Sequence, residues 1–263
     1  MNLYRGCTHQ CIYCDSRSEC YQIENFTDVL VKVNAIDLLR KELPRKRVKG
    51  TIGTGSMSDP YLPLEATRNL TGQALEVIAQ HQFPVHALTK SDLVLRDLET
   101  LREINRVYAA VSFTITTADD DLGKRLEPGA PIVSRRFAAL EQLAAAGILT
   151  GVLLMPVLPF IEDNAENITT IVSRAHDCGA AYILASFGMT LRDRQRAHYY
   201  AQLDRLFPGL RKQYERRFGD RYSASANDAH RLEHIFRAQC DRFGIATRMP
   251  MYEAPASLQP ALL

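Results

Sequence analysis

The chain lacks any apolar run long enough to cross a membrane. Its longest apolar stretch, residues 147–161, is interrupted by Thr150, Pro156 and Pro159, whereas a membrane helix needs about 18–20 consecutive apolar residues. The N-terminus begins with polar and charged residues and shows no secretory signal. We therefore expect no membrane segment and a cytoplasmic location.

The chain also has little net charge and no compositional bias. Its formal net charge is +2 over 263 residues, which is too small to indicate a nucleic-acid partner by itself. Hydrophobic residues make up 46% and charged residues 24%, without internal repeats or low-complexity tracts. This composition excludes disorder, collagen and coiled coil, and it suits one large domain, alone or with an appendage.

Positive charge is concentrated near the C-terminus. Residues 190–243 contain 12 lysines and arginines against 7 aspartates and glutamates, whereas residues 1–189 contain 19 against 22. Two interpretations of the basic segment stay open: it is a solvated helical face, or it is a surface that faces a polyanion.

The cysteines are arranged for metal binding rather than for disulfides. Four of the six fall within the first twenty residues: Cys7, Cys11, Cys14 and Cys20. A disulfide framework is not typical of a chain of this length without an export signal. Taken singly, Cys20, Cys178 and Cys240 are expected to be small buried apolar side chains.

Apolar periodicity alternates between strand and helix up to residue 187. Strands are predicted over residues 2–5, 48–52, 84–88, 107–113, 148–155 and 181–187. Helices are predicted over residues 27–43, 65–80, 92–104, 134–146 and 163–178. Because strands and helices alternate, we expect right-handed βαβ units and a parallel sheet.

The alternation ends after Phe187. Residues 190–243 are Arg-rich and helical in pattern, with a break at Pro208, and the tail from Pro250 is irregular. The first strand is short, so either the sheet begins abruptly or the natural chain starts upstream of Met1.

The motif Cys7-x3-Cys11-x2-Cys14 carries the main chemical signal. Three thiolates on one tight loop can each hold one iron of a cubane cluster, which leaves the fourth iron open. Cys20 is a further candidate ligand at an unusual spacing. A structural zinc site would add His9 to the three cysteines, but His9 has no second ligand pair beside it.

Other polar residues follow predicted strands, at the ends where a barrel builds its site. Residues 51–61, Thr-Ile-Gly-Thr-Gly-Ser-Met-Ser-Asp-Pro-Tyr, combine glycines that let the backbone approach a ligand with hydroxyls and a carboxylate for a ribose or an amino group. Lys90 either pairs with a carboxylate at the barrel mouth or lies on the surface at a helix start. Ser112 ends the fourth strand, and residues 125–129 are a candidate for an ion pair over the site.

Together these residues resemble the radical S-adenosylmethionine (SAM) superfamily, whose signature is C-x3-C-aromatic-x-C or a close variant. Within it, residues 4–21, 56–61, 89–91 and 112–129 resemble the spore photoproduct lyase-like branch, and the resemblance covers roughly residues 2–190. It implies an α/β partial (β/α)6 TIM-type barrel over residues 1–189. Residues 190–263 would then form an Arg-rich helical extension and tail.

The resemblance also implies the cofactors and their ligands. Cys7, Cys11 and Cys14 would bind a [4Fe-4S] cluster whose open iron chelates SAM, and the reduced cluster would cleave SAM to a 5′-deoxyadenosyl radical. Tyr13 would lie beside the adenine, and Lys90 would bind the SAM carboxylate. The remaining SAM contacts would be Ser56, Ser58, Asp59 and Ser112.

Two positions depart from the lyase pattern. The lyase has a hydrogen-donor cysteine in the loop after the second strand, where this chain has Ser56, and a tyrosine after the third cluster cysteine, where it has Asp15. The radical-generating residues are thus present, while those that quench the product radical differ. Catalytic residues and substrate stay open: a nucleic acid, a peptide or a small metabolite. An electron donor such as flavodoxin or ferredoxin is expected. The alternative is a non-catalytic iron–sulfur or zinc binding protein.

Overall fold

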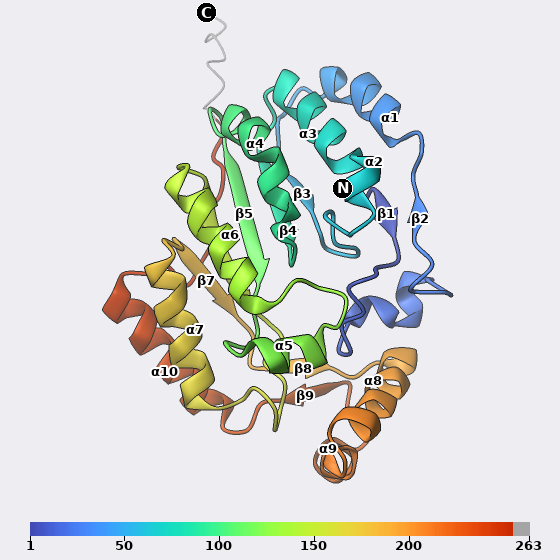
Figure 1. Ribbon diagram of the computed structural model, residues 1–263, viewed down its shortest axis with the longest axis vertical. Helices are drawn as coiled ribbons and strands as arrows, with labels where there is room; N and C mark the ends of the chain where they lie inside the picture. Colours follow the sequence, from blue (N-terminus) through green and yellow to red (C-terminus); the bar gives the residue numbers. More distant parts are fainter. Residues whose placement is uncertain (255–263) are drawn as a thin grey trace, which may run out of the picture.

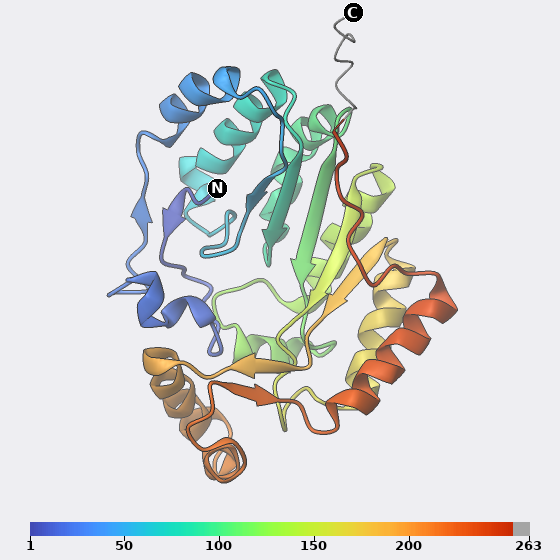
Figure 2. The same ribbon diagram turned by 180° about the vertical axis from the view of Figure 1, so that it is seen from behind.

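A parallel sheet with helices packed on one of its faces forms the centre of the molecule. The computed structural model describes residues 1–254, and Figures 1 and 2 show it from the helix side and from behind. Neighbouring strands in the sheet follow chain order: β3 (Ile52–Thr54), β4 (Val85–Thr89), β5 (Ala109–Thr114), β6 (Leu149–Leu154) and β7 (Tyr182–Ala185). The main connecting helices are α3 (Leu70–Gln80), α4 (Leu98–Ile104), α6 (Val133–Ala145) and α7 (Ala165–Asp177). The predicted α/β partial barrel is confirmed.

The elements form where apolar side chains recur at the matching period. All six residues of β5 are buried, because helices cover one face of this central strand and the other face lies in the packed interior of the barrel. Helix α7 buries one stripe, Ile168, Ile171, Val172 and Ala175, which is the stripe predicted from the sequence.

Two of the predicted helices are interrupted. Residues 65–80 form α2 (Glu65–Arg68) and α3, separated by Asn69 in a left-handed conformation with φ 49°. The break allows the fully buried Glu65 carboxylate to accept a hydrogen bond from the Thr71 amide at 2.8 Å. Residues 92–104 begin as a 3₁₀ helix and continue as α4.

The first strand and the first helix differ from the prediction. β1 (Tyr4–Arg5) pairs antiparallel with β2 (Leu30–Val31) and does not join the parallel sheet. The predicted helix over residues 27–43 therefore begins only at α1 (Ala35–Glu42), because the preceding backbone is used for strand pairing. Val33 is 87% exposed, so its helical spacing did not mark a buried face.

The predicted strand over residues 48–52 lies four residues too early. Val48 is 78% exposed, and pairing in the sheet starts at Ile52, opposite Val85. Val48 is an isolated apolar residue in a charged segment, so the predicted start of the strand at this residue is wrong.

The chain after β7 forms two different parts. β8 (Gly188–Thr190), α8 (Asp193–Leu206), α9 (Leu210–Phe218) and β9 (Ser223–Ser225) make a small lobe in which β8 and β9 pair antiparallel. Helices α8 and α9 separate around Pro208 as predicted, whereas β9 was expected to be helical. The small lobe lies beside the cysteine loop (Figure 2).

Helix α10 (Ala229–Phe243) returns the chain to the barrel. It packs against α7, and Ala246 then forms a parallel bridge with Tyr182 at the free edge of β7. Part of the predicted extension thus continues the barrel. The predicted boundary between residues 189 and 190 falls within β8, and residues 255–263 of the predicted extension lie outside the described residues. Within residues 1–254, no helix has both the length and the apolar character to span a membrane.

Candidate functional site

A cavity of about 610 Å³ opens at the C-terminal ends of the parallel strands. Its walls come from the cysteine loop, from the segments that follow β3, β4 and β6, and from the end of β5, with β8 and β9 on the remaining side. This is the end of the barrel at which parallel α/β barrels place their chemistry.

Cys7, Cys11 and Cys14 all line this cavity, and all are free thiols. Burial raises the pKa of each of them, that of Cys7 to about 11. A coordinating metal displaces thiol protons, so such buried thiols become metal ligands once the metal is bound. Within residues 1–254, no three Cys, His, Asp or Glu side chains are gathered closely enough to hold a single metal ion. Three thiols on one loop at one cavity wall are the ligands expected for a cubane cluster with one open iron, and this assignment stays a prediction.

Cys20 is not part of this group. It is exposed, contrary to the prediction, and does not line the cavity. Its Sγ lies 3.5 Å from the Ser18 hydroxyl and 3.4 Å from the Arg192 guanidinium. Cys178 is half-buried and Cys240 is buried, which fits the packing role predicted for them.

The loop over residues 125–129 holds the cysteine loop in place. The Ile12 amide donates to the Leu126 carbonyl at 2.9 Å, and the Gly129 amide donates to the His9 carbonyl at 2.9 Å. Residue 129 must be glycine, because a Cβ atom there would lie 2.0 Å from the Thr8 carbonyl oxygen. The two loops therefore form one unit at the barrel mouth.

Both ring nitrogens of His9 lie close to oxygen atoms of the protein. Its Nδ1 lies 3.2 Å from the Gly129 carbonyl oxygen, and its Nε2 lies 3.1 Å from Asp59 Oδ2. His9 is 1% exposed. One ring nitrogen of His9 thus lies beside a carbonyl and the other beside a carboxylate, and a Cys3His zinc site stays the alternative prediction.

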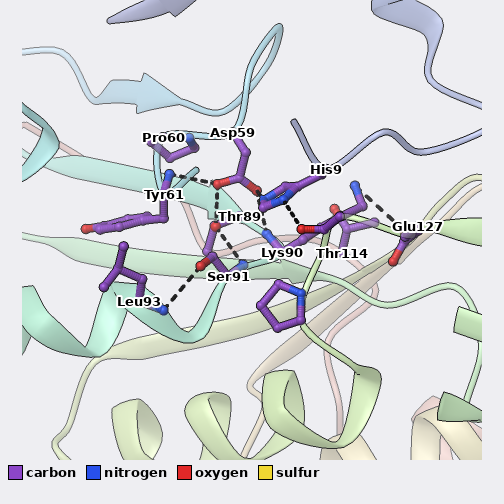
Figure 3. Close-up of polar contacts among 12 residues, drawn as sticks. His9, Asp59, Pro60, Tyr61, Thr89, Lys90, Ser91, Leu93, Thr114 and Glu127 are labelled. Atoms are coloured by element: carbon purple, nitrogen blue, oxygen red, sulfur yellow. Dashed lines mark hydrogen bonds and ion pairs between the residues drawn. The ribbon is translucent and has the colours of Figure 1, made fainter. Parts of the chain in front are cut away.

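Asp59 joins three segments around the cavity (Figure 3). Its carboxylate accepts hydrogen bonds from the Thr89 hydroxyl at 2.6 Å, the Lys90 amide at 2.7 Å and the Tyr61 amide at 2.8 Å. Burial raises the pKa of Asp59, but His9 and these donors outweigh burial and bring the pKa to about 2. Asp59 lines the cavity, as predicted, with its oxygens already engaged by the protein.

Lys90 faces the barrel mouth and pairs with a carboxylate, as predicted. Its Nζ lies 3.9 Å from Glu127 Oε1 and 5.8 Å from the centre of the Tyr13 ring. Burial lowers the pKa of Lys90, but Cys11 and Glu127 outweigh burial and the net effect raises it. Among the described residues that line the cavity, Lys90 is the only lysine or arginine.

The predicted ion pair on the 125–129 loop is present, and its partner comes from α6. Glu127 is 2% exposed, forms an ion pair with Arg136, and accepts a hydrogen bond from the Tyr13 hydroxyl. Arg136 is itself 1% exposed. Arg125 lies over the Phe207 ring instead, with its guanidinium carbon 4.2 Å from the ring centre.

Ser56 and Ser58 line the cavity, as does Tyr13. The Ser58 hydroxyl is buried and has no hydrogen-bond partner within residues 1–254, so it is free to bind a ligand. Gly55 precedes these serines with φ +90°, and a Cβ atom there would lie 2.1 Å from the Leu88 carbonyl oxygen. Only glycine allows this turn to pack so closely on β4.

Ser112 does not reach the cavity. It is fully buried inside the barrel, where its hydroxyl binds His86 Nε2 at 2.7 Å and the Tyr182 hydroxyl at 2.6 Å. The strand continues to Thr114, and it is Thr114 that lines the cavity. The prediction ended this strand one residue early, at residue 113, and so placed Ser112 nearer the barrel mouth than it is.

The small lobe supplies a wall that the sequence did not predict. Described lining residues on this side include Met189, Thr190, Ser223, Ala224 and Ser225. None of these side chains carries a charge. No local pattern marks β9 as a strand. It is a strand because it pairs with β8, and more than thirty residues separate the two in the sequence.

The same lobe is tied directly to the cysteine loop. The Gln195 side chain donates to the Tyr13 carbonyl at 3.1 Å, across 182 residues of sequence. Thr190 donates to Asp15 at 2.6 Å, and Arg192 forms an ion pair with Asp15 at 3.1 Å. The lobe therefore takes part in positioning the three cysteines.

Comparisons with known proteins show the family of the chain. The model of the radical SAM superfamily matches residues 1–171. An uncharacterized protein of Mycobacterium tuberculosis is 31% identical over 223 residues, which cover 81% of this chain and 65% of that protein. An uncharacterized protein of Methanocaldococcus jannaschii is 34% identical over 166 residues, which cover 62% and 61%. The chain thus spans less than two thirds of the length of either relative.

Among solved structures, the fold is similar to that of spore photoproduct lyase. A mutant of that enzyme, solved with bound AdoMet and dinucleoside spore photoproduct, has a TM-score of 0.70 and 17% sequence identity. The match covers 95% of this chain and 76% of that one. With the three-cysteine cavity at the barrel mouth and a family match over residues 1–171, the chain belongs to the radical SAM superfamily of enzymes.

Proposed function

We propose that the protein binds a [4Fe-4S] cluster through Cys7, Cys11 and Cys14 and binds SAM in the adjoining cavity, to start a radical reaction by reductive cleavage of SAM. One observation carries this proposal: three free cysteines with the superfamily spacing line the same cavity as Lys90 and the unpartnered Ser58 hydroxyl. When bound, the two cofactors supply an electron and a 5′-deoxyadenosyl radical.

The chain's own residues bind and orient SAM. Lys90 is suited to the SAM carboxylate, because Glu127 is already paired with Arg136 and lies 3.9 Å from the Lys90 nitrogen. The Lys90 ammonium therefore keeps donors for a second anion. Ser56 and Ser58 are proposed to bind polar groups of SAM.

Tyr13 is proposed to pack beside the adenine. Its hydroxyl is held by Glu127 and its carbonyl by Gln195, so the ring has a single orientation. Asp59 is proposed to shape the SAM site by holding His9, Thr89 and the Lys90 backbone together. The resemblance implies a contact between Ser112 and SAM. In this proposal Thr114, which lines the cavity, makes that contact instead.

For the substrate, we propose a nucleoside unit of a nucleic acid. The support is the fold likeness to an enzyme whose structure contains a dinucleoside, together with the uncharged, partly hydroxyl-bearing residues of the wall from β8 and β9. The reaction is not that of the lyase, because Ser56 replaces the donor cysteine and Asp15 is engaged with Thr190 and Arg192.

Anaerobic reconstitution tests the proposal directly. The protein is loaded with iron and sulfide, reduced with dithionite in the presence of SAM, and the products are separated by chromatography. We expect about four irons per chain and release of 5′-deoxyadenosine. Stoichiometric zinc without iron uptake, or a cluster that leaves SAM intact, would support the non-catalytic alternative instead.

A second assay tests the departure from the lyase. The reduced protein is incubated with SAM and dinucleotide spore photoproduct, and the released thymidylyl-thymidine is measured. We expect SAM cleavage with little or no repair, since an alcohol gives up its hydrogen atom far less readily than a thiol. Efficient repair would show that another hydrogen donor, such as Cys20, serves this site.

The physiological electron is proposed to come from a carrier such as flavodoxin or ferredoxin.

A further inference from the structure

A second cavity, of about 270 Å³, lies behind the cysteine loop. It forms where residues 17–27 meet α8, and we call it the Arg17 cavity after one of its lining residues. Its described lining residues are Arg17, Ile23, Glu24, Asn25, Phe26, Thr27, Arg194 and His198. Ser16 lines the SAM cavity and the adjacent Arg17 lines this one, so one short turn of chain separates them.

Arg17 brings to this cavity a positive charge that no carboxylate within residues 1–254 pairs with. Its guanidinium carbon lies 4.4 Å from the centre of the Phe26 ring, which fixes the side chain. Its Nε is buried and has no acceptor within residues 1–254. Other enclosed arginines of the chain are satisfied: Arg136 binds Glu127, and Arg96 binds Glu65 and Asp97.

Arg194 and His198 come from consecutive turns of α8 and line the same cavity. Within residues 1–254, neither side chain forms an ion pair of 4.0 Å or less, and the exposed Glu24 forms none either. Burial, and after it the charge of Arg17, lowers the pKa of His198 to about 4. His198 is therefore a neutral group whose surroundings are already positive.

We propose that the Arg17 cavity binds an oxyanion, namely a phosphate group, through Arg17, Arg194 and His198. Guanidinium groups match phosphate oxygens in charge and geometry, and their hydrogen bonds to phosphate are charge-assisted. The SAM cavity has only Lys90 as a lysine or arginine among its described lining residues. A phosphate-bearing ligand thus finds its second cationic site behind the cysteine loop.

The phosphate has two sources that share this chemistry: a strand phosphate of a nucleic acid, or a small free phosphate. The inference does not depend on the proposed SAM chemistry, because it concerns a separate cavity. A competing explanation is that Arg17 only balances the charge of a cluster held by the nearby cysteines. That explanation leaves Arg194 and His198 without a role.

The test uses the protein reconstituted with its cluster and measures binding by calorimetry at constant ionic strength. The probes are inorganic phosphate and a short single-stranded oligonucleotide, with chloride as the reference anion. The variants are Arg194→Gln, which lies on α8 away from the cysteines, and Arg17→Gln/Arg194→Gln. The matched control is Arg216→Gln, an exposed arginine of α9 that lines neither cavity.

We expect the parent and the control to bind phosphate alike, Arg194→Gln to bind it more weakly, and the double variant to bind it at least about tenfold more weakly. A parallel loss of oligonucleotide binding identifies a strand phosphate as the source, whereas an unchanged oligonucleotide affinity identifies a small phosphate. No phosphate binding by the parent would overturn the proposal. The proposal would also be overturned if the double variant bound phosphate as tightly as the parent, even if its iron content had changed. Release of 5′-deoxyadenosine, measured separately, reports on the proposed function whichever result is obtained.

Discussion

The two walls of the cavity at the barrel mouth are built in different ways. The barrel wall holds a network of buried charges in which Asp59, Lys90 and Glu127 are joined through short loops after the strands. The wall from the small lobe presents uncharged residues such as Met189 and Ser225. Fixed charges suit a cofactor that is always the same, whereas a neutral wall suits recognition of a substrate by shape and hydrogen bonding.

The difference extends to how each wall is stabilised. Glu127 and Arg136 are almost completely buried, so each depends on the other for compensation of its charge. Arginines of the small lobe are mostly exposed. Arg211 pairs within the lobe, with Asp204 and Glu215, whereas Arg192 pairs with Asp15 of the cysteine loop. Both interpretations of the basic segment, a solvated helical face and a surface that faces a polyanion, stay predictions.

The largest expected effect is on the cysteine loop. Cys11→Ala should abolish cluster binding, because removal of one of three thiolates leaves an incomplete set of ligands. Iron content and the charge-transfer absorbance after reconstitution measure this. Cys178→Ala is the matched control and should bind about four irons. A Cys11→Ala protein with a full complement of iron would show that the ligands have been assigned wrongly.

The next effect concerns the charged wall. Glu127→Gln leaves Arg136 buried without a counter-charge, and we expect a loss of about 3–5 kcal/mol in the free energy of unfolding. Urea denaturation measures this loss. Arg237→Gln removes an exposed ion pair with Glu233 and should leave the midpoint nearly unchanged. Equal stability of the two variants would contradict the contrast between buried and exposed pairs.

A smaller effect is expected on SAM affinity. Lys90→Ala should weaken SAM binding by about 1.5–3 kcal/mol, the value of a hydrogen bond to a charged group. Calorimetry on the reconstituted protein measures the change, and iron content should stay at the parent level because Lys90 is no ligand. An unchanged affinity would show that the SAM carboxylate binds elsewhere. Lys49→Ala, outside the cavity, is the control.

The smallest effect is expected where the small lobe holds the cysteine loop. Gln195→Ala removes the hydrogen bond to the Tyr13 carbonyl, worth about 0.5–1.5 kcal/mol. We expect the cluster to form but to release iron faster to a chelator. Gln202→Ala on the same helix is the control and should release iron at the parent rate. If both variants release iron at the same rate, the lobe does not stabilise the cysteine loop and contributes only a wall of the cavity.

Much of the barrel wall was predictable because its signals are local. The three cysteines lie within eight residues, and Lys90 directly follows a strand with a clear apolar pattern. The small lobe was harder to predict. β9 has only three residues and pairs with a strand on the other side of two helices, so no sequence window contains both partners.

The sequence by itself determined the α/β class, the cysteine motif and the position of Lys90 after its strand, because side-chain period and residue spacing act over a few residues. Only the tertiary structure decided that Arg136 neutralises Glu127, that Gln195 holds the Tyr13 carbonyl, and that Ser112 lies below the cavity while Thr114 lines it. These outcomes depend on which distant segments pack together and on how deeply each residue is then buried. Hydrogen bonds and ion pairs form between groups that packing brings within about 3–4 Å, and separation along the chain does not encode that distance.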